Sequence, residues 1–204
     1  MNSYSFGVML GMAKIGAGKV NNPYYTPELV QAASVLTATQ RAQLEGRGCS
    51  PLEKTCRTRS RFGFQLSLPI QLGGEGVSFR LEPTFGFADG AQSYGLYFGP
   101  AFNFHVYQNL YLGFGLGVKG GWLKADDWRY AGDVFGRIPL TATYYLIDDL
   151  ALVIDFGFGI GVSGYYTDRV VRDPRTNRPI AKKAPDATFG VAGTWDLSFG
   201  LRFP

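Results

Sequence analysis

Three kinds of side chain in this sequence could take part in chemistry: one histidine, two cysteines, and a few charged residues set among apolar ones. His105 is the only histidine. A catalytic base needs a nucleophile beside it and an acid that orients it. No such grouping surrounds His105, so we expect a structural histidine and no enzyme activity.

The two cysteines, Cys49 and Cys56, lie close together in the polar stretch RGCSPLEKTCRTR. A close pair in a loop favours a disulfide, which would imply passage through an oxidising compartment. Two free thiols are the alternative. Two ligands without a nearby histidine cannot complete a tetrahedral zinc shell, so we expect no metal site and no cofactor.

Alternation of residue types marks the elements that must position these groups. In the stretch TWDLSFGLRFP, large apolar residues from Trp195 to Phe203 alternate with small or charged ones. A period of two indicates a strand with two different faces. The pattern recurs along the chain and predicts eight strands, over 4–12, 62–72, 77–87, 94–106, 110–122, 134–146, 150–162 and 195–203.

The connections between these strands alternate between short and long. Residues 73–76, 108–109 and 148–149 predict hairpin turns. Residues 15–60, 88–93, 124–133 and 165–187 predict long loops. Tilted strands of about ten residues, with tight turns at one end and long loops at the other, are typical of bacterial outer-membrane barrels. An even number of strands places both termini at the short-turn end.

Composition and the two strand faces favour a membrane barrel over a soluble one. Charged residues make up 18% of the chain, below the value of about 25% for soluble domains. No apolar run is long enough for a transmembrane helix. The second strand face is rich in Gly, Ser, Thr, Ala and Tyr, which suits a crowded interior. We therefore expect the apolar rows to face lipid; a soluble lipocalin-like barrel is the alternative.

The charged residues of the strands all lie on the small-residue face. They must pair or stay hydrated, because an isolated buried charge is costly. An eight-stranded barrel is just wide enough for its own side chains, so we expect a filled polar lumen; a gate or filter is the alternative. The predicted lumen network is Arg80, Glu82, His105, Lys119, Arg137, Asp155, Asp196 and Arg202. Bends or bulges are expected at four prolines inside strands, Pro69, Pro83, Pro100 and Pro139.

On these residues the sequence resembles the small eight-stranded outer-membrane barrels, the group that includes the OmpA transmembrane domain, OmpX, OmpW and PagP. Its last strand, WDLSFGLRF, is similar to the C-terminal signal read by the barrel assembly machinery, with Trp195, Phe199, Leu201 and Phe203 as its apolar positions. The resemblance implies one all-β antiparallel up-and-down barrel domain over residues 1–204 in the bacterial outer membrane. Both termini would be periplasmic, and outer-membrane lipid and lipopolysaccharide would surround the barrel. In OmpA-like proteins a hinge and a further domain follow, which leaves a boundary after Pro204 open.

Two predicted extracellular loops carry more than a connection needs. In loop 1 (15–60), Thr26-Pro27-Glu28 is typical of a helix start, and loops above about 12–15 residues are usually functional or disordered. A helix pinned by the predicted Cys49–Cys56 bridge would suit a surface or membrane protein partner. Loop 4 (165–187) is basic and would meet lipopolysaccharide phosphates or, alternatively, a specific acidic partner. Its basic residues are Arg169, Arg172, Arg175, Arg178, Lys182 and Lys183.

The sequence thus predicts an integral outer-membrane barrel with a structural or surface-interaction role through loops 1 and 4. A narrow channel for small solutes is the first alternative, and a lipid-modifying outer-membrane enzyme is the second. Nucleic-acid binding is not expected, because no recognisable module surrounds the basic residues.

Overall fold

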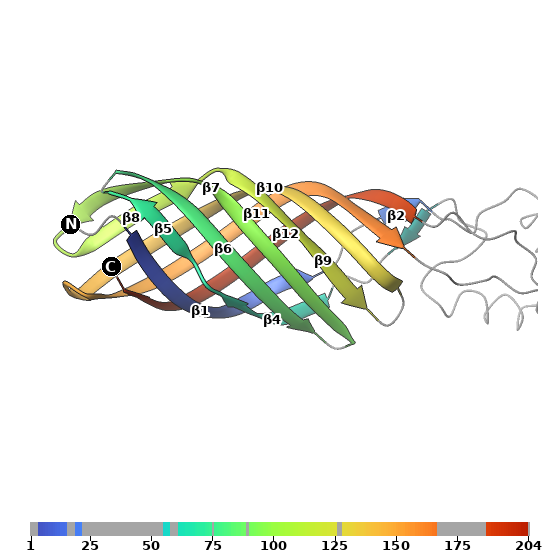
Figure 1. The fold of residues 1–204 in the computed structure, drawn as a ribbon, viewed down its shortest axis with the longest axis horizontal. Helices are drawn as coiled ribbons and strands as arrows, with labels where there is room; N and C mark the ends of the chain where they lie inside the picture. The colour runs from blue at the N-terminus through green and yellow to red at the C-terminus, as the bar shows by residue number, and fades with distance from the viewer. Residues whose placement is uncertain are drawn as a thin grey trace, which may run out of the picture.

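The computed structural model describes residues 4–15, 19–21, 55–57, 61–74, 76–88, 90–125, 128–166 and 187–203. Within these ranges the regular structure is entirely β-strand (Figure 1). The strands are β1 (Tyr4–Ile15), β2 (Lys19–Asn21), β3 (Thr55–Arg57), β4 (Arg61–Ser67), β5 (Ile70–Gly73), β6 (Val77–Ala88), β7 (Ala91–Tyr107), β8 (Leu110–Gly115), β9 (Gly117–Ala125), β10 (Trp128–Ile147), β11 (Leu150–Tyr166) and β12 (Ala187–Phe203).

The strands close into an eight-stranded antiparallel barrel, as predicted. β4 and β5 form one barrel strand with a short interruption, since Ser67 lies opposite Thr84 and Ile70 lies opposite Leu81 in unchanged register. β8 and β9 likewise form one strand, interrupted at Leu116. Around the barrel the order is β1, β4/β5, β6, β7, β8/β9, β10, β11, β12 and back to β1. Closure leaves none of these eight strands as a sheet edge along its paired length.

The four strand prolines fall in pairs at the two interruptions. Pro69 lies in the first interruption, where its carbonyl accepts from Gly7 N (2.8 Å), and the Pro83 carbonyl accepts from Leu68 N (3.0 Å). Pro100 accepts from Leu116 N (3.2 Å) at the second. The ladder between β10 and β8/β9 stops and resumes on either side of Pro139. Because proline has no N–H to donate, each pair leaves a gap in the ladder. The register does not shift, so the prolines produce gaps rather than bulges.

The first hairpin is longer than the sequence predicted. Ile15 lies opposite Arg61 in the β1–β4 ladder, and Lys19 lies opposite Arg57 in the β2–β3 ladder, which is the same register. β2 and β3 therefore continue the β1–β4 hairpin past the barrel wall. The connection predicted over 15–60 shortens to residues 22–54. The predicted helix and Cys49 lie outside the described residues, as does the side chain of Cys56, so the disulfide stays a prediction.

Two connections predicted to be long are tight. β6 ends at Ala88 directly opposite Ala91, the first residue of β7, and the Asp-Gly sequence between them is a strong hairpin signal. Gly90 has a φ of 62°. Likewise β9 ends at Ala125 and β10 begins at Trp128. Polar residues in 88–93 and 124–133 suggested loops, but strands keep their polar residues where they extend beyond the lipid-facing band.

The other connections agree with the sequence. Turns occur at 74–76, 108–109 and 148–149, and the connection after β11 covers 167–186. All three turns lie at the end of the barrel that holds both chain ends (Figure 1). The three short turns thus oppose two long and two tight connections at the other end.

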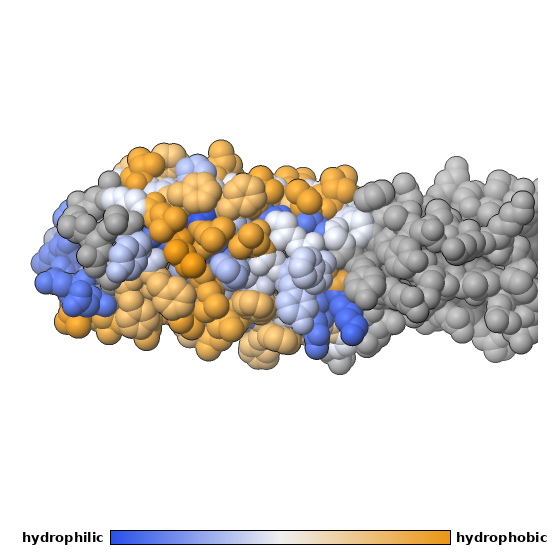
Figure 2. All heavy atoms as spheres, in the orientation of Figure 1, coloured by the Kyte–Doolittle hydropathy of each residue, from blue (hydrophilic) through white to orange (hydrophobic). Residues whose placement is uncertain are grey.

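The polarity of the barrel is inside out relative to a soluble protein. Large apolar side chains cover the outer wall, where Phe64 is 76% exposed, Ile160 69% and Leu10 59%, and Figure 2 shows them as a broad apolar surface. The buried polar residues point into the lumen. Water would not support such a wall, whereas lipid does. The barrel is therefore a transmembrane fold. Among the described residues, no helix is long and apolar enough to span a bilayer.

Candidate functional site: an ion-pair network in the lumen

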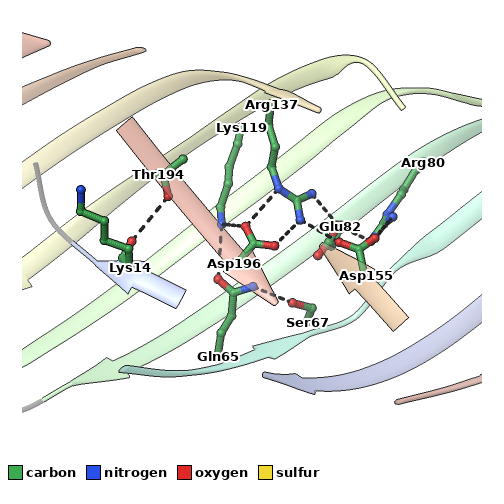
Figure 3. Close-up of polar contacts among 10 residues, drawn as sticks. All are labelled: Lys14, Gln65, Ser67, Arg80, Glu82, Lys119, Arg137, Asp155, Thr194 and Asp196. Atoms are coloured by element: carbon green, nitrogen blue, oxygen red, sulfur yellow. Dashed lines mark hydrogen bonds and ion pairs between the residues drawn. The ribbon is translucent and has the colours of Figure 1, made fainter. Parts of the chain in front are cut away.

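The lumen is crossed by a network of charged side chains from strands on all sides (Figure 3). β6 contributes Arg80 and Glu82, and β10 contributes Arg137. β11 and β12 contribute Asp155 and Asp196. Each of these side chains is at most 1% exposed. Alternation along the strands places all five inside, because residues two apart in a strand share a face.

Arg137 is the centre of the network. Its Nη2 lies 2.5 Å from Oδ1 of Asp196, and its Nε donates to Oδ2 of the same carboxylate at 3.1 Å. Nη2 also donates to Oδ1 of Asp155 (3.1 Å), and Nη1 donates to Oε2 of Glu82 (3.2 Å). The two-bond contact with Asp196 uses the fork geometry that suits arginine to carboxylates. One guanidinium thus joins β6, β10, β11 and β12.

Arg80 braces the barrel across its full width. Its Nη1 lies 2.5 Å from Oδ2 of Asp155, and its Nη2 lies 2.7 Å from Oε2 of Glu82. β6 and β11 are four places apart in a ring of eight strands, so they are diametrically opposed. The Arg80–Asp155 pair therefore crosses the lumen from one side of the barrel to the other.

Lys119 lies at the edge of the network nearest the long connections. Its Nζ is 3.8 Å from Oδ2 of Asp196 and 3.3 Å from Oε1 of Gln65, which in turn donates to Ser67 (3.0 Å). The network then contains three cations, Arg80, Lys119 and Arg137, against three carboxylates, Glu82, Asp155 and Asp196. It is neutral as a whole. Neutrality matters because a buried charge without a partner is costly.

Sequence reasoning missed Tyr97 as a member of the site. Its ring is fully buried, and the guanidinium carbons of Arg137 and Arg80 lie 5.1 and 6.0 Å from the ring centroid. These distances suit cation–π contacts. Space for the ring comes from β9, because a Cβ on Gly117 would lie 2.7 Å from the Tyr97 ring. The signal in the sequence was a large aromatic residue on the small-residue face, opposite a glycine-rich strand.

Two predicted members lie apart from the network. His105 is exposed near the short-turn end, where its Nε2 is 2.6 Å from the Gln108 carbonyl and its ring packs against Tyr111 at 5.0 Å. Alternation along β7 predicts that the side chain of His105 faces the lumen. At residue 105, however, the strand extends beyond the closed interior, so the side chain is exposed. Arg202 is buried near the same end and donates to the Thr143 hydroxyl (3.3 Å). Neither His105 nor Arg202 forms an ion pair with the three cations and three carboxylates of the network.

The predicted assembly residues of β12 lie on the outer wall. Phe199, Leu201 and Phe203 are exposed there, while Trp195 is half-buried against Phe62, with ring centroids 5.5 Å apart. The basic residues of loop 4 lie in 167–186, outside the described residues.

The arrangement can act as a plug and a brace, and its carboxylates are engaged by cations. No group of three or more histidine, cysteine or acidic side chains in the described ranges could hold a metal ion. Replacing a buried ion network by apolar residues is often neutral, whereas removing one partner is strongly destabilising. We therefore expect the network to specify how the interior fits together more than it adds net stability.

Comparison with known proteins supports the fold alone. No protein-family model matches the chain, and no curated protein sequence matches it. Among solved structures, the chain is similar to Neisserial surface protein A (NspA), with 10% identity over 99% of this chain and 97% of that one and a TM-score of 0.55. It is more distantly similar to outer membrane protein OprG from Pseudomonas aeruginosa (8% identity, 98% and 95% covered, TM-score 0.47) and to the outer membrane protease OmpT from Escherichia coli (9%, 98% and 96%, 0.42). With its closed eight-stranded wall, apolar outside and charged inside, the chain has the fold of the small outer-membrane β-barrels.

Proposed function

We propose that this protein is an integral outer-membrane barrel that acts at the cell surface through its two long connections, residues 22–54 (the loop 1 tip) and 167–186 (the loop 4 tip). Both termini would then be periplasmic. The observation that carries the proposal is where these connections begin. β2 lies beside the first residues of β12 (Figure 1). The loop 1 tip and the loop 4 tip therefore begin from neighbouring points of the barrel. The other two connections at that end are tight turns.

The two tips differ in charge, which suggests different partners. The loop 4 tip carries the six basic residues Arg169, Arg172, Arg175, Arg178, Lys182 and Lys183 against Asp168, Asp173 and Asp186. Its charge suits the phosphate groups of lipopolysaccharide. The loop 1 tip is balanced, with Arg41, Arg47 and Lys54 against Glu28, Glu45 and Glu53. A surface or membrane protein that contacts its predicted helix is the partner that we propose for it.

The ion-pair network that crosses the lumen supports this surface role over the narrow channel. The Arg80–Asp155 pair spans the barrel, and almost no surface is exposed on the five side chains Arg80, Glu82, Arg137, Asp155 and Asp196. In planar bilayers the refolded protein should therefore give no defined conductance, with a known porin refolded in parallel as the positive control. Discrete, reproducible openings would overturn the plug and favour the channel.

We assign no catalytic role. Glu82, Asp155 and Asp196 are held by cations. His105 lies at the short-turn end, where its contacts are with the carbonyl of Gln108 and the ring of Tyr111 rather than with an acidic side chain. We also propose that the outward-facing Phe199, Leu201 and Phe203 are read by the barrel assembly machinery, because they form an exposed apolar row on the last strand.

Two loop variants test the surface role. In the first, residues 24–52 are replaced by a short Gly/Ser linker, which keeps the β2–β3 hairpin; in the second, the six basic residues of the loop 4 tip become glutamine. Both variants should still fold, as judged by heat-modifiable migration on a gel. Binding to lipopolysaccharide should weaken in the second variant and persist in the first. Equal binding by both variants and the wild type would show that loop 4 is not the contact.

The loop 1 contact needs its own readout in cells. A photo-crosslinking amino acid at position 29 or 33 should give one discrete adduct if loop 1 docks a protein. A crosslinker at exposed Asp148, on the opposite end of the barrel, serves as the matched control. The same adduct from both positions, or none from loop 1, would refute a loop 1 partner.

A further inference from the structure

A small cavity lies in the lumen between the ion-pair network and the long connections. Residues of β1, β4, β6, β7, β9, β10 and β12 line it, and it is partly open. It offers the centres of water-sized molecules about 50 Å³, whereas a single water needs about 10–15 Å³. The cavity therefore has room for a few waters or for one small molecule of similar size.

Glycines on the inner faces of two strands make this room. Gly95 on β7 lies opposite Gly121 on β9, which in turn lies opposite Asp133 on β10. A Cβ built on Gly95 would lie 2.7 Å from the hydroxyl oxygen of Thr84 and 3.3 Å from Cε of Lys119. Those two side chains therefore border the space beside Gly95, and any side chain at position 95 would take up part of the cavity.

Asp133 brings a negative charge to the cavity without a cation beside it. It lines the cavity and is half-buried, and its Oδ1 is buried with no hydrogen-bond partner in the described part of the chain. The Ser163 hydroxyl lies opposite it in the β10–β11 ladder, but a hydroxyl carries no charge that could neutralise a carboxylate. Lys119 acts on Asp133 only from beyond ion-pair distance. A carboxylate in such a setting favours a cationic hydrogen-bond donor as its partner.

Lys119 brings the opposite charge, and it is only loosely held. Its Nζ is 3.8 Å from Oδ2 of Asp196, which is beyond hydrogen-bond distance, and 3.3 Å from Oε1 of Gln65. An ammonium group has three N–H donors, so donors remain for a ligand. The Lys119 side chain is 15% exposed, against at most 1% for its partner Asp196. Lys14 is the remaining charged residue of the lining. The cavity is thus lined by charges of both signs that do not pair with each other.

We propose that the cavity binds one small zwitterion, a molecule with a primary ammonium group at one end and a carboxylate at the other. The ammonium group donates to Asp133, and the carboxylate accepts from Lys119. The ligand thereby completes the ion pair that these two residues do not form directly. A ligand with a single charge would leave one of the two residues unpaired and would face a like charge across the cavity. Binding at this edge of the network needs no path through the lumen.

β-Alanine, in which two carbons separate the charged groups, is the probe for this site. The wild-type barrel is refolded in detergent at neutral pH, and the amide signals of Gly95 and Gly121 are followed by NMR as β-alanine is added. We expect shifts that saturate. Propylamine and propionate carry one charge each, and β-alanine betaine keeps both charges without an N–H donor, so each should bind about tenfold more weakly or less. Equal affinity for β-alanine and its betaine, or no saturable shift, would overturn the proposal.

Two pairs of variants locate the site. Asp133→Asn removes the charge and should weaken β-alanine binding about tenfold, the effect of losing a hydrogen bond to a charged group. Asp148→Asn makes the same change in an exposed turn at the opposite end of the barrel and should bind like the wild type. Gly95→Ala keeps every charge and should also lose binding, because its methyl group fills part of the cavity. Gly136→Ala adds its methyl group to the outer wall, where nothing lies closer than the Ile160 carbonyl at 3.8 Å. Equal affinities within either pair would refute the site.

A structural readout keeps the proposal testable if Asp133→Asn or Gly95→Ala folds poorly. In the wild type, isotope-labelled β-alanine should give intermolecular NOEs to the methyl groups of Ala13 and Thr84, which line the cavity. Saturable binding without those NOEs, or NOEs to the outward-facing Leu10 instead, would overturn the proposal.

Discussion

Replacing Gly157 by alanine should disrupt the lumen network, although the change adds only a methyl group. Gly157 lies on β11 opposite Asp196 on β12 and Pro139 on β10. A Cβ built on it would overlap Nε and Nη2 of Arg137 and would lie 2.7 Å from Cζ. The strand cannot retreat, because ladders hold β11 on both sides. The guanidinium must move instead.

The size of the effect follows from the contacts that Arg137 would lose. Carbon atoms pack at about 3.5–4.0 Å, so Cζ must shift by at least about 0.8 Å. The bonds to Asp196, at 2.5 and 3.1 Å, and to Asp155, at 3.1 Å, would then lengthen or break. Overpacking alone costs about 1–3 kcal/mol, and breaking a buried ion pair costs about 3–5 kcal/mol. We expect a loss of about 3 kcal/mol in the free energy of unfolding, between those two limits.

Gly136→Ala is the matched control. Gly136 lies on β10 and faces lipid, and a Cβ there would approach nothing closer than the Ile160 carbonyl at 3.8 Å. Since alanine is favoured over glycine in a strand by about 0.5–1 kcal/mol, this variant should be as stable as the wild type or slightly more so. Both variants would be refolded into lipid vesicles and unfolded in urea, with tryptophan fluorescence and heat-modifiable migration as probes. Equal stability of the two variants would refute the placement of Arg137 beside Gly157.

Two further substitutions probe the network and a hairpin, each by urea unfolding in the same vesicles. Glu82→Gln should cost about 3–5 kcal/mol because it leaves two buried arginines short of an acid, whereas Asp149→Asn in an exposed turn should stay within about 0.5 kcal/mol; a small loss at Glu82 would mean that the pairs are hydrated. Gly90→Ala should cost about 1–2 kcal/mol, because the φ of 62° there is strained for a residue with a Cβ. Gly74→Ala, with an ordinary φ and no atom within 4 Å of the new Cβ, is its control, and equal losses would contradict the turn geometry.

The strands and their sidedness were predictable from the sequence because each residue's face depends only on position in an alternating pattern. From Trp195 to Phe203 the pattern is unbroken, and the structure places Asp196 and Arg202 inside as it requires. Strand ends were less predictable. Past the lipid band both faces become polar, so the alternation fades although the ladder continues, as at β2–β3.

The pairing within the lumen could not be read from the sequence. Alternation says that Arg80 and Asp155 point inward, but which inward groups meet depends on strand tilt and on which strands face each other across the barrel. The same limit explains why His105 was grouped with the network. Its face was predicted, yet its height along the barrel axis, which places it at the rim, was not.

The network also makes charge burial and barrel closure one event. Arg80 and Asp155 lie on diametrically opposed strands, and Asp196 reaches Arg137 from the last strand, so the three cations and three carboxylates of the network balance only when β12 is in place. A partly assembled sheet would hold Arg137 without Asp196 and would keep its charged face in water. Lipid could accept only the outer face, so a stable membrane-inserted intermediate lacking β12 is disfavoured on charge grounds alone. The inward charges thereby couple insertion to the arrival of the strand that closes the ring.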